Sequence, residues 1–163
     1  MRAIVLEDAF GVDHLRAVEL DDDPLGPGEV SVRIRAVSLN YRDLLMVRGQ
    51  YDPRQPLPLI PCSDGAGTVE AVGEGVSRFA PGDRVLPCFM QGWLTPQVPR
   101  LKADLRKSLG GPLPGTLAER RVFPEYGLVR APAHLSYEEA ATLPCAALTA
   151  WRALVTQGGL QPG

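Results

Sequence analysis

The densest group of chemically capable side chains in this sequence is the stretch Ile60-Pro61-Cys62-Ser63-Asp64-Gly65-Ala66-Gly67. A thiol, a hydroxyl and a carboxylate followed by two glycines could belong to a metal site, a phosphate-binding loop or a turn. A phosphate-binding loop needs a third glycine and a following helix, whose N-terminal amides hold the pyrophosphate. The strand-like Thr68-Val69-Glu70 follows instead, so we exclude a phosphate-binding loop.

A metal site needs more ligands than this stretch supplies, because a catalytic zinc ion usually takes three from the protein. The three cysteines, Cys62, Cys88 and Cys145, are widely spaced and include no Cys-x-x-Cys pair, which argues against a disulfide framework or a zinc knuckle. The two histidines, His14 and His134, fall in expected loops. From residue types alone, the stretch is interpreted as a turn that can face a cleft.

The composition is that of an ordinary globular chain: 163 residues, 45% hydrophobic and 22% charged, with a net charge of −2. No block of basic residues indicates nucleic acid or an anionic membrane as a partner. The apolar runs are too short to span a bilayer, and the start MRAIVLED lacks the apolar core of a signal peptide. We therefore expect a soluble cytoplasmic protein.

The elements that must position these side chains are mostly short strands, with turns about every ten residues. Alternation is clearest in Glu29–Leu39, where Val30 and Val32 should point inward and Arg33 outward. The other expected strands are Arg2–Glu7, Leu15–Leu20, Thr68–Val72 and parts of Leu117–Val129. This pattern predicts a small β-barrel or partly closed sheet with helical additions.

Two helical regions are predicted. Residues 40–49 should form a short helix with Asn40 as its N-cap and Asp43 reaching back to the cap, and residues 136–157 should be helical. In the second region Ser136 and Glu139 form a capping box, and Trp151 should pack into the core. We expect the acidic run at 21–23 to be a solvated loop, and 88–115 to be irregular with at most one helical turn within 98–111.

Three segments together resemble the N-terminal catalytic domain of the medium-chain dehydrogenase/reductase superfamily, the zinc-type alcohol dehydrogenases and the zinc-free quinone oxidoreductases. They are GPGEVSVRIRAVSLNYRDLLMVRGQY, PLIPCSDGAGTVEAVGEGVSRFAPGDRV and EEAATLPCAALTAWRALV with its closing QPG. The resemblance covers residues 1–163 and implies a mainly β fold, the GroES-like partly open β-barrel. It also implies that the nucleotide-binding Rossmann domain is absent from this chain and that residues 136–157 lead toward it.

The resemblance gives the opening stretch a position. In zinc-using members a histidine ligand and a glutamate occupy the place of Ser63-Asp64, and cysteine ligands fall near Asn40 and at Cys145. One ligand of three is therefore kept, and the family's four-cysteine structural zinc lobe has only Cys88 here. The resemblance implies no metal and a zinc-free reductase that passes hydride from NADP or NAD cofactors to an activated alkene, quinone or carbonyl.

Without a metal, side-chain donors must stabilise charge on the acceptor oxygen. The catalytic candidates are Asn40, Tyr41, Tyr51 and Ser63. Thr149 and Cys145 are expected on the cofactor side, and Asp43 and Asp64 in supporting roles. Each has a plainer interpretation: a helix cap for Asn40 and Asp43, packing for the tyrosines and Cys145, and a backbone hydrogen bond for Thr149.

The expected partners are a small-molecule substrate, the missing nucleotide-binding domain and, for the full-length protein, a second copy in a homodimer. The isolated chain is expected to bind NAD(P)H poorly and to turn over nothing. Two alternatives stay open: a zinc-dependent alcohol dehydrogenase with atypical ligands, and a non-enzymatic GroES-like binding module. The sequence does not name the substrate or decide between NADP and NAD, because that preference lies in the nucleotide-binding half.

Overall fold

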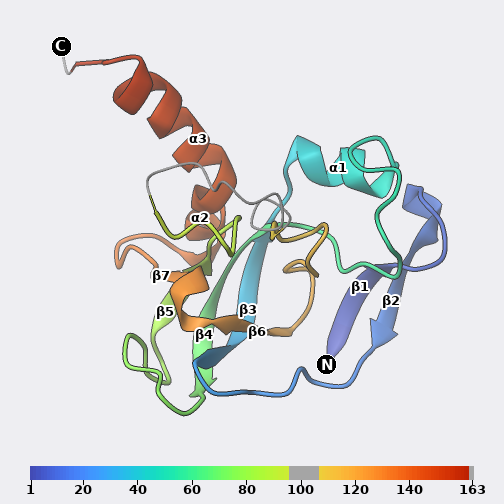
Figure 1. Ribbon diagram of the computed structural model, residues 1–163, viewed down its shortest axis with the longest axis horizontal. Helices are drawn as coiled ribbons and strands as arrows, with labels where there is room; N and C mark the ends of the chain where they lie inside the picture. The colour runs from blue at the N-terminus through green and yellow to red at the C-terminus, as the bar shows by residue number, and fades with distance from the viewer. Residues whose placement is uncertain (96–106, 162–163) are drawn as a thin grey trace.

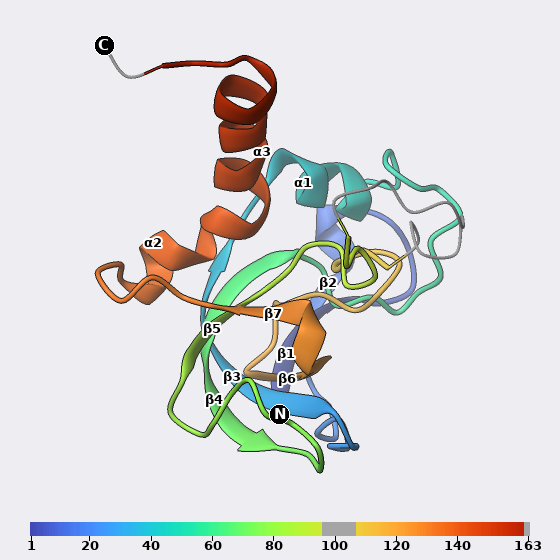
Figure 2. The same cartoon turned by 60° about the vertical axis from the view of Figure 1, so that its left-hand side comes forward.

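The computed structural model describes residues 1–95 and 107–161 and is organised around one curled antiparallel sheet (Figure 1). Its strand order is β6-β3-β4-β5-β7. The bounds are β3 Glu29–Ser38, β4 Asp64–Val72, β5 Arg84–Pro87, β6 Arg120–Pro124 and β7 Leu128–Arg130. Figure 2 shows β3 and β4 curving around the interior of the sheet, and the predicted partly open barrel is confirmed.

A separate hairpin closes one side of the molecule (Figure 1). It consists of β1 (Arg2–Leu6) and β2 (Leu15–Glu19), paired antiparallel, with the short 3-10 turn η1 (Val12–His14) before β2. Reciprocal backbone bonds of 2.8 and 3.0 Å join Leu6 to Leu59. The hairpin is therefore fastened to the segment that leads into the Cys62 stretch.

The core lies inside the curl of the sheet. Val30 and Val32 of β3 are fully buried, as their alternation predicts, and Phe123 of β6 packs in the same cluster. Removing a side chain of that size from such a core typically costs about 3–5 kcal/mol. On the outer face, Arg33 hydrogen-bonds Glu70 of β4, so this face carries cross-strand ion pairs.

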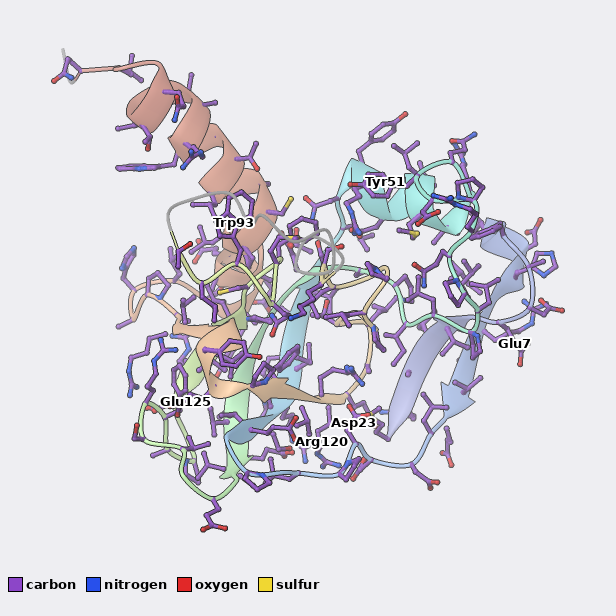
Figure 3. All side chains as sticks on the ribbon, viewed as in Figure 1. Glu7, Asp23, Tyr51, Trp93, Arg120 and Glu125 are labelled. Atoms are coloured by element: carbon purple, nitrogen blue, oxygen red, sulfur yellow. The ribbon has the colours of Figure 1, made fainter. Side chains whose placement is uncertain are left out.

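The acidic run 21–23 is a loop, as predicted, with Asp21 and Asp22 exposed, but its carboxylates are also held in ion pairs. Asp22 pairs with Arg120 and with the N-terminal ammonium, and Asp23 pairs with Arg121 (Figure 3 labels Asp23 and Arg120). Two consecutive arginines on β6 attract the carboxylates that the linker brings past them. The run therefore fastens the link between β2 and β3 to the edge strand of the sheet.

The helices lie at one end of the sheet (Figure 1). Helix α1 (Tyr41–Val47) follows β3, the 3-10 turn η3 (Glu125–Gly127) joins β6 to β7, and α2 (Tyr137–Ala141) packs on β3 and β4. Helical residues then continue through η4 (Leu143–Ala147), α3 (Leu148–Trp151) and η5 (Arg152–Gln157). Among the described residues, no helix is both long and apolar enough to cross a bilayer.

The final helix projects away from the barrel in both views (Figures 1 and 2). Trp151 is 63% exposed, and its neighbours Leu148 and Leu154 are exposed as well. The prediction that Trp151 packs into the core is therefore wrong, because no described element lies against this face. The helical turn predicted within 98–111 falls mostly outside the described residues.

Candidate active site

The Cys62 stretch forms a bend that is held from behind by residues 115 and 116. Cys62 has a φ of 68°, in the left-handed region that costs non-glycine residues about 1–2 kcal/mol. The backbone N–H of Thr116 donates to the Cys62 carbonyl at 2.9 Å. A Cβ on Gly115 would lie 2.0 Å from that carbonyl oxygen, so only glycine fits. A bend is found as predicted, but β4 begins at Asp64 and not at Thr68.

Asp64 is completely buried, and both of its carboxylate oxygens accept hydrogen bonds. The Ser63 hydroxyl donates to Oδ1 at 2.7 Å, and the backbone N–H of Cys145 donates to Oδ2 at 2.9 Å. A buried carboxylate is costly unless it is hydrogen-bonded in this way. Asp64 therefore joins the first residue of β4 to the start of the C-terminal helical segment.

Asp43, in the first turn of α1, is the second buried carboxylate. Its Oδ2 accepts from the backbone N–H of Asn40 at 2.8 Å, as the predicted cap requires, and the backbone N–H of Ser63 also donates to it. Burial raises the pKa of Asp43, and the charge of Asp64 adds to this. These effects outweigh the donors and the nearby Arg42, which act to lower the pKa.

Asn40 supplies an unused donor next to the two carboxylates. Its side-chain Nδ2 is buried and has no hydrogen-bond partner among the described residues. Buried amide groups are normally hydrogen-bonded, because an unpaired donor costs about 1–3 kcal/mol. The Asn40 amide is therefore a donor that the described part of the chain leaves unused.

The thiols are in their protonated form near neutral pH. Burial, with a further contribution from Asp43 and Asp64, raises the pKa of Cys62 to about 12. Burial also raises the pKa of Cys145, although a hydrogen bond with Thr149 acts to lower it. Neither thiol is therefore activated as a nucleophile by its surroundings.

The remaining donors do not complete a zinc site. Among residues 1–95 and 107–161, no three His, Cys, Asp or Glu side chains come together in a way that could hold a metal ion. His14 is paired with Asp8 at 2.8 Å, and His134 is exposed in the link before α2. The side chains of the described residues therefore do not by themselves assemble a zinc ligand set.

Six of the eight predicted site residues form one connected group through the contacts described above: Asn40, Asp43, Ser63, Asp64, Cys145 and Thr149. Ser63 is completely buried, with its hydroxyl donated to Asp64. Tyr41 is 74% exposed and Tyr51 53% exposed. Tyr51 lies beside α1 (Figure 3) and is joined to the group through Arg42, while Tyr41 lies outside it.

Arg42 is the residue that sequence reasoning missed. Its guanidinium carbon lies 4.7 Å from the centre of the Tyr51 ring and 4.9 Å from that of Phe89. One signal was present in the sequence. A basic side chain in the first turn of a helix interacts unfavourably with the helix dipole. The position of Arg42 is therefore not explained by the stability of α1.

A shallow cavity of about 490 Å³ lies elsewhere, between the β1–β2 hairpin and residues around Pro58 and Ile60. Its rim carries acidic side chains, including Glu7 and Asp21. None of the predicted site residues lines it. The cavity is therefore separate from the group of polar residues around Asp64.

Known proteins resemble this chain both in sequence and in fold. The model of the alcohol dehydrogenase GroES-like domain matches residues 26–133. A zinc-type alcohol dehydrogenase-like protein of Schizosaccharomyces pombe is 43% identical over 157 residues, 94% of this chain and 44% of that protein. A chloroplastic quinone oxidoreductase of Triphysaria versicolor is 36% identical over 163 residues, 98% of this chain and 44% of that protein.

Solved structures agree with these relatives. The crystal structure of an NAD-dependent alcohol dehydrogenase superposes with a TM-score of 0.85 at 40% identity, over 100% of this chain and 49% of that one. The chain thus spans about half the length of the proteins it matches. On fold, family model and sequence identity together, the chain belongs to the alcohol dehydrogenase GroES-like domain family of the medium-chain dehydrogenase/reductase superfamily.

Proposed function

We propose that this chain is the catalytic-domain portion of a nicotinamide-dependent oxidoreductase that works without zinc. The substrate class is an activated alkene, a quinone or a carbonyl compound, reduced by hydride transfer. The NADP or NAD cofactor would be bound mainly by a nucleotide-binding domain outside this chain and would supply the hydride. Within this chain, Thr149 and Cys145 are the residues proposed to meet its nicotinamide side.

The observation that carries the proposal is the orphaned amide of Asn40. Reduction of a conjugated carbonyl or quinone puts negative charge on the acceptor oxygen, and a positioned donor stabilises that charge. Asn40 Nδ2 is such a donor, since it is buried and without a partner in the described part of the chain. The hydroxyls of Tyr51 and Tyr41 are the additional proposed donors. The enclosed Ser63 hydroxyl supports the site from within through Asp64.

The fixed partners of Asp64 explain how the group keeps its geometry. Its two oxygens hold Ser63 and the backbone of Cys145, so the barrel and the first turn of the C-terminal helix are aligned with each other. Asp43 holds the backbone of Asn40 in the same way. Both carboxylates are thus proposed to orient the residues that meet substrate and cofactor, without themselves contacting the reacting atoms.

The proposal is tested with the full-length enzyme, NADPH or NADH, and a panel of quinones and enones. Replacing Asn40→Ser keeps a good N-cap but removes the amide donor. We expect kcat/KM to fall about 10²-fold with the helix intact, which is the usual effect of losing one oxyanion donor. Unchanged kcat/KM with a normal circular dichroism spectrum would remove Asn40 from the mechanism.

Zinc dependence is the second candidate, favoured by the name of the Schizosaccharomyces pombe relative, which is of the zinc type. Metal analysis of the dialysed full-length enzyme separates the two. We expect far less than one zinc ion per chain, and turnover that survives 1,10-phenanthroline. Near-stoichiometric zinc, with activity lost to the chelator and restored by zinc, would establish the second candidate.

The isolated chain is proposed to be inactive, because the relatives are about twice as long. Titration of NADPH fluorescence against residues 1–163 should show no saturable binding in the micromolar range. Saturation there would contradict the assignment of cofactor binding to the other half.

A further inference from the structure

Arg42 lies at the junction of four chain segments next to the residues proposed to bind the acceptor. Its side chain is only 11% exposed, which is rare for arginine unless the charge is paired or hydrogen-bonded. Its guanidinium lies over the rings of Tyr51, after α1, and Phe89, after β5. Each such cation–π contact is stabilising, and more so when it is desolvated.

The same guanidinium fixes a third segment, the loop of residues 108–111. Arg42 Nη2 donates to the Gly111 carbonyl at 2.6 Å, and Nη1 donates to the Leu109 carbonyl at 3.2 Å. The Ser108 hydroxyl donates to the same Gly111 carbonyl at 2.5 Å and lies 3.4 Å from Nη2. Three hydrogen bonds and two ring contacts of one side chain thus hold neighbouring segments.

Within the part of the chain that the structure describes, the charge of Arg42 is not taken up by a close ion pair. The nearest carboxylate oxygen there is Oδ1 of Asp43, 3.9 Å from Nη1, and that oxygen has no hydrogen bond of its own to these residues. Arg42 Nε is likewise buried and unpartnered there. A residue present only for stability would be expected to pair more completely, so the geometry indicates a role in shaping the site.

We propose that Arg42 is a positioning residue for acceptor binding, holding the Tyr51 ring and the 108–111 loop in the orientation that the pocket requires. The inference rests on the proposed function, because Tyr51 is the donor through which Arg42 acts. Lysine cannot replace it, since an ammonium group has neither the planar fork nor the flat face for stacking.

The test uses the full-length enzyme with NADPH and the best quinone or enone acceptor. Arg42→Lys keeps the charge, Arg42→Met keeps the stem, and Arg48→Lys at the exposed end of the same helix is the matched control. We expect both Arg42 variants to lower kcat/KM for the acceptor by about 10²-fold, as misplacement of a reacting group does. KM for NADPH should stay unchanged, and the control should match the wild type.

A double variant separates positioning from mere stability. The double variant Arg42→Lys with Tyr51→Phe should lower kcat/KM for the acceptor no further than Tyr51→Phe alone. The effects of two residues are not additive when one acts through the other. Full additivity, or wild-type kinetics with a lowered melting temperature, would overturn the inference. A wild-type enzyme without turnover on any acceptor would instead refute the proposed function.

A spectroscopic readout examines the contact independently of turnover. In the full-length protein labelled with 3-fluorotyrosine, the Tyr51 ¹⁹F signal is assigned by its loss in Tyr51→Phe. It should move toward the position of a solvent-exposed ring in Arg42→Lys and stay in place in Arg48→Lys. An unmoved signal in Arg42→Lys would show that Arg42 does not hold the ring.

Discussion

At the scale of single residues, two carboxylates of the same type behave differently because their partners differ. Asp64 has a donor on each oxygen, whereas Asp43 leaves Oδ1 without one in the described part of the chain. Burial of the less satisfied group raises its pKa. Asp43 is therefore one residue through which the stability of the fold depends on pH.

The prediction at this scale concerns Asp43→Asn. The folded chain holds the Asp43 proton more tightly than the unfolded chain, so the contribution of Asp43 to stability falls as pH rises from 3.8, its ordinary value, through the raised pKa. Asparagine keeps an acceptor for the Asn40 N–H and does not ionise. Urea unfolding midpoints are measured for both proteins at pH 3.5 and pH 7. The midpoint of the variant relative to that of the wild type should be higher at pH 7 than at pH 3.5.

The wild type and the variant share all other carboxylates, so the pH dependence that those groups cause cancels when the two urea midpoints are subtracted. A difference in urea midpoint, variant minus wild type, that is constant with pH or that falls as pH rises would show that Asp43 is not held as described.

At the scale of elements, helix ends were the features most readable from sequence. Ser136 Oγ accepts from the backbone N–H of Glu139 at 3.1 Å, and the Glu139 carboxylate accepts from the Ser136 N–H at 2.8 Å. Both bonds join residues three apart, so the pattern is complete within four positions of sequence. Helix α2 then packs Ala140 and Ala141 against the sheet. This packing depends on the cap, because the cap fixes where the helix begins.

Removal of this cap is the prediction at the element scale. Ser136→Ala should lower the free energy of unfolding by about 1 kcal/mol, because an orphan N–H of the first turn loses its acceptor. Ser136→Asp retains an acceptor and serves as the control, expected within about 0.5 kcal/mol of the wild type. Equilibrium unfolding in urea measures both, and equal stability of all three proteins would show that the cap does not contribute.

Features that depend on distant contacts could not be read from the sequence. Arg42 hydrogen-bonds the carbonyl of Gly111, 69 positions away, and no local sequence pattern predicts such a partner. Strand β4 begins four residues earlier than predicted because Gly65 and Gly67 lie inside it. A Cβ at Gly67 would lie 2.4 Å from the Arg33 carbonyl on β3. Glycine was thus required by the neighbouring strand, although its residue type indicated a turn.

At the scale of the whole molecule, the barrel and the projecting helix differ in how completely they are covered. The barrel interior is closed by Val30, Phe123 and their neighbours. The helix instead exposes Leu148, Trp151 and Leu154. The sequence predicts a buried Trp151, but burial depends on what packs against a helix face, and no described residue covers this one.

This difference predicts the fluorescence of the two tryptophans of residues 1–163. Trp151 is 63% exposed and Trp93 is 40% exposed. Acrylamide should therefore quench the Trp93→Phe variant, which retains Trp151, more strongly than Trp151→Phe. The reverse order would show that the helix face is covered in the isolated chain.

The left-handed backbone at Cys62 has a consequence for how this chain tolerates change. Glycine adopts that conformation without steric cost, and asparagine does so more readily than other residues. Because Cys62 is buried, an asparagine amide there would need hydrogen-bond partners, so a library randomised at position 62 and selected for thermal resistance should return glycine alongside cysteine and more often than asparagine. Since the thiol is buried and protonated, such a replacement would act through backbone strain and packing and not through protection from oxidants.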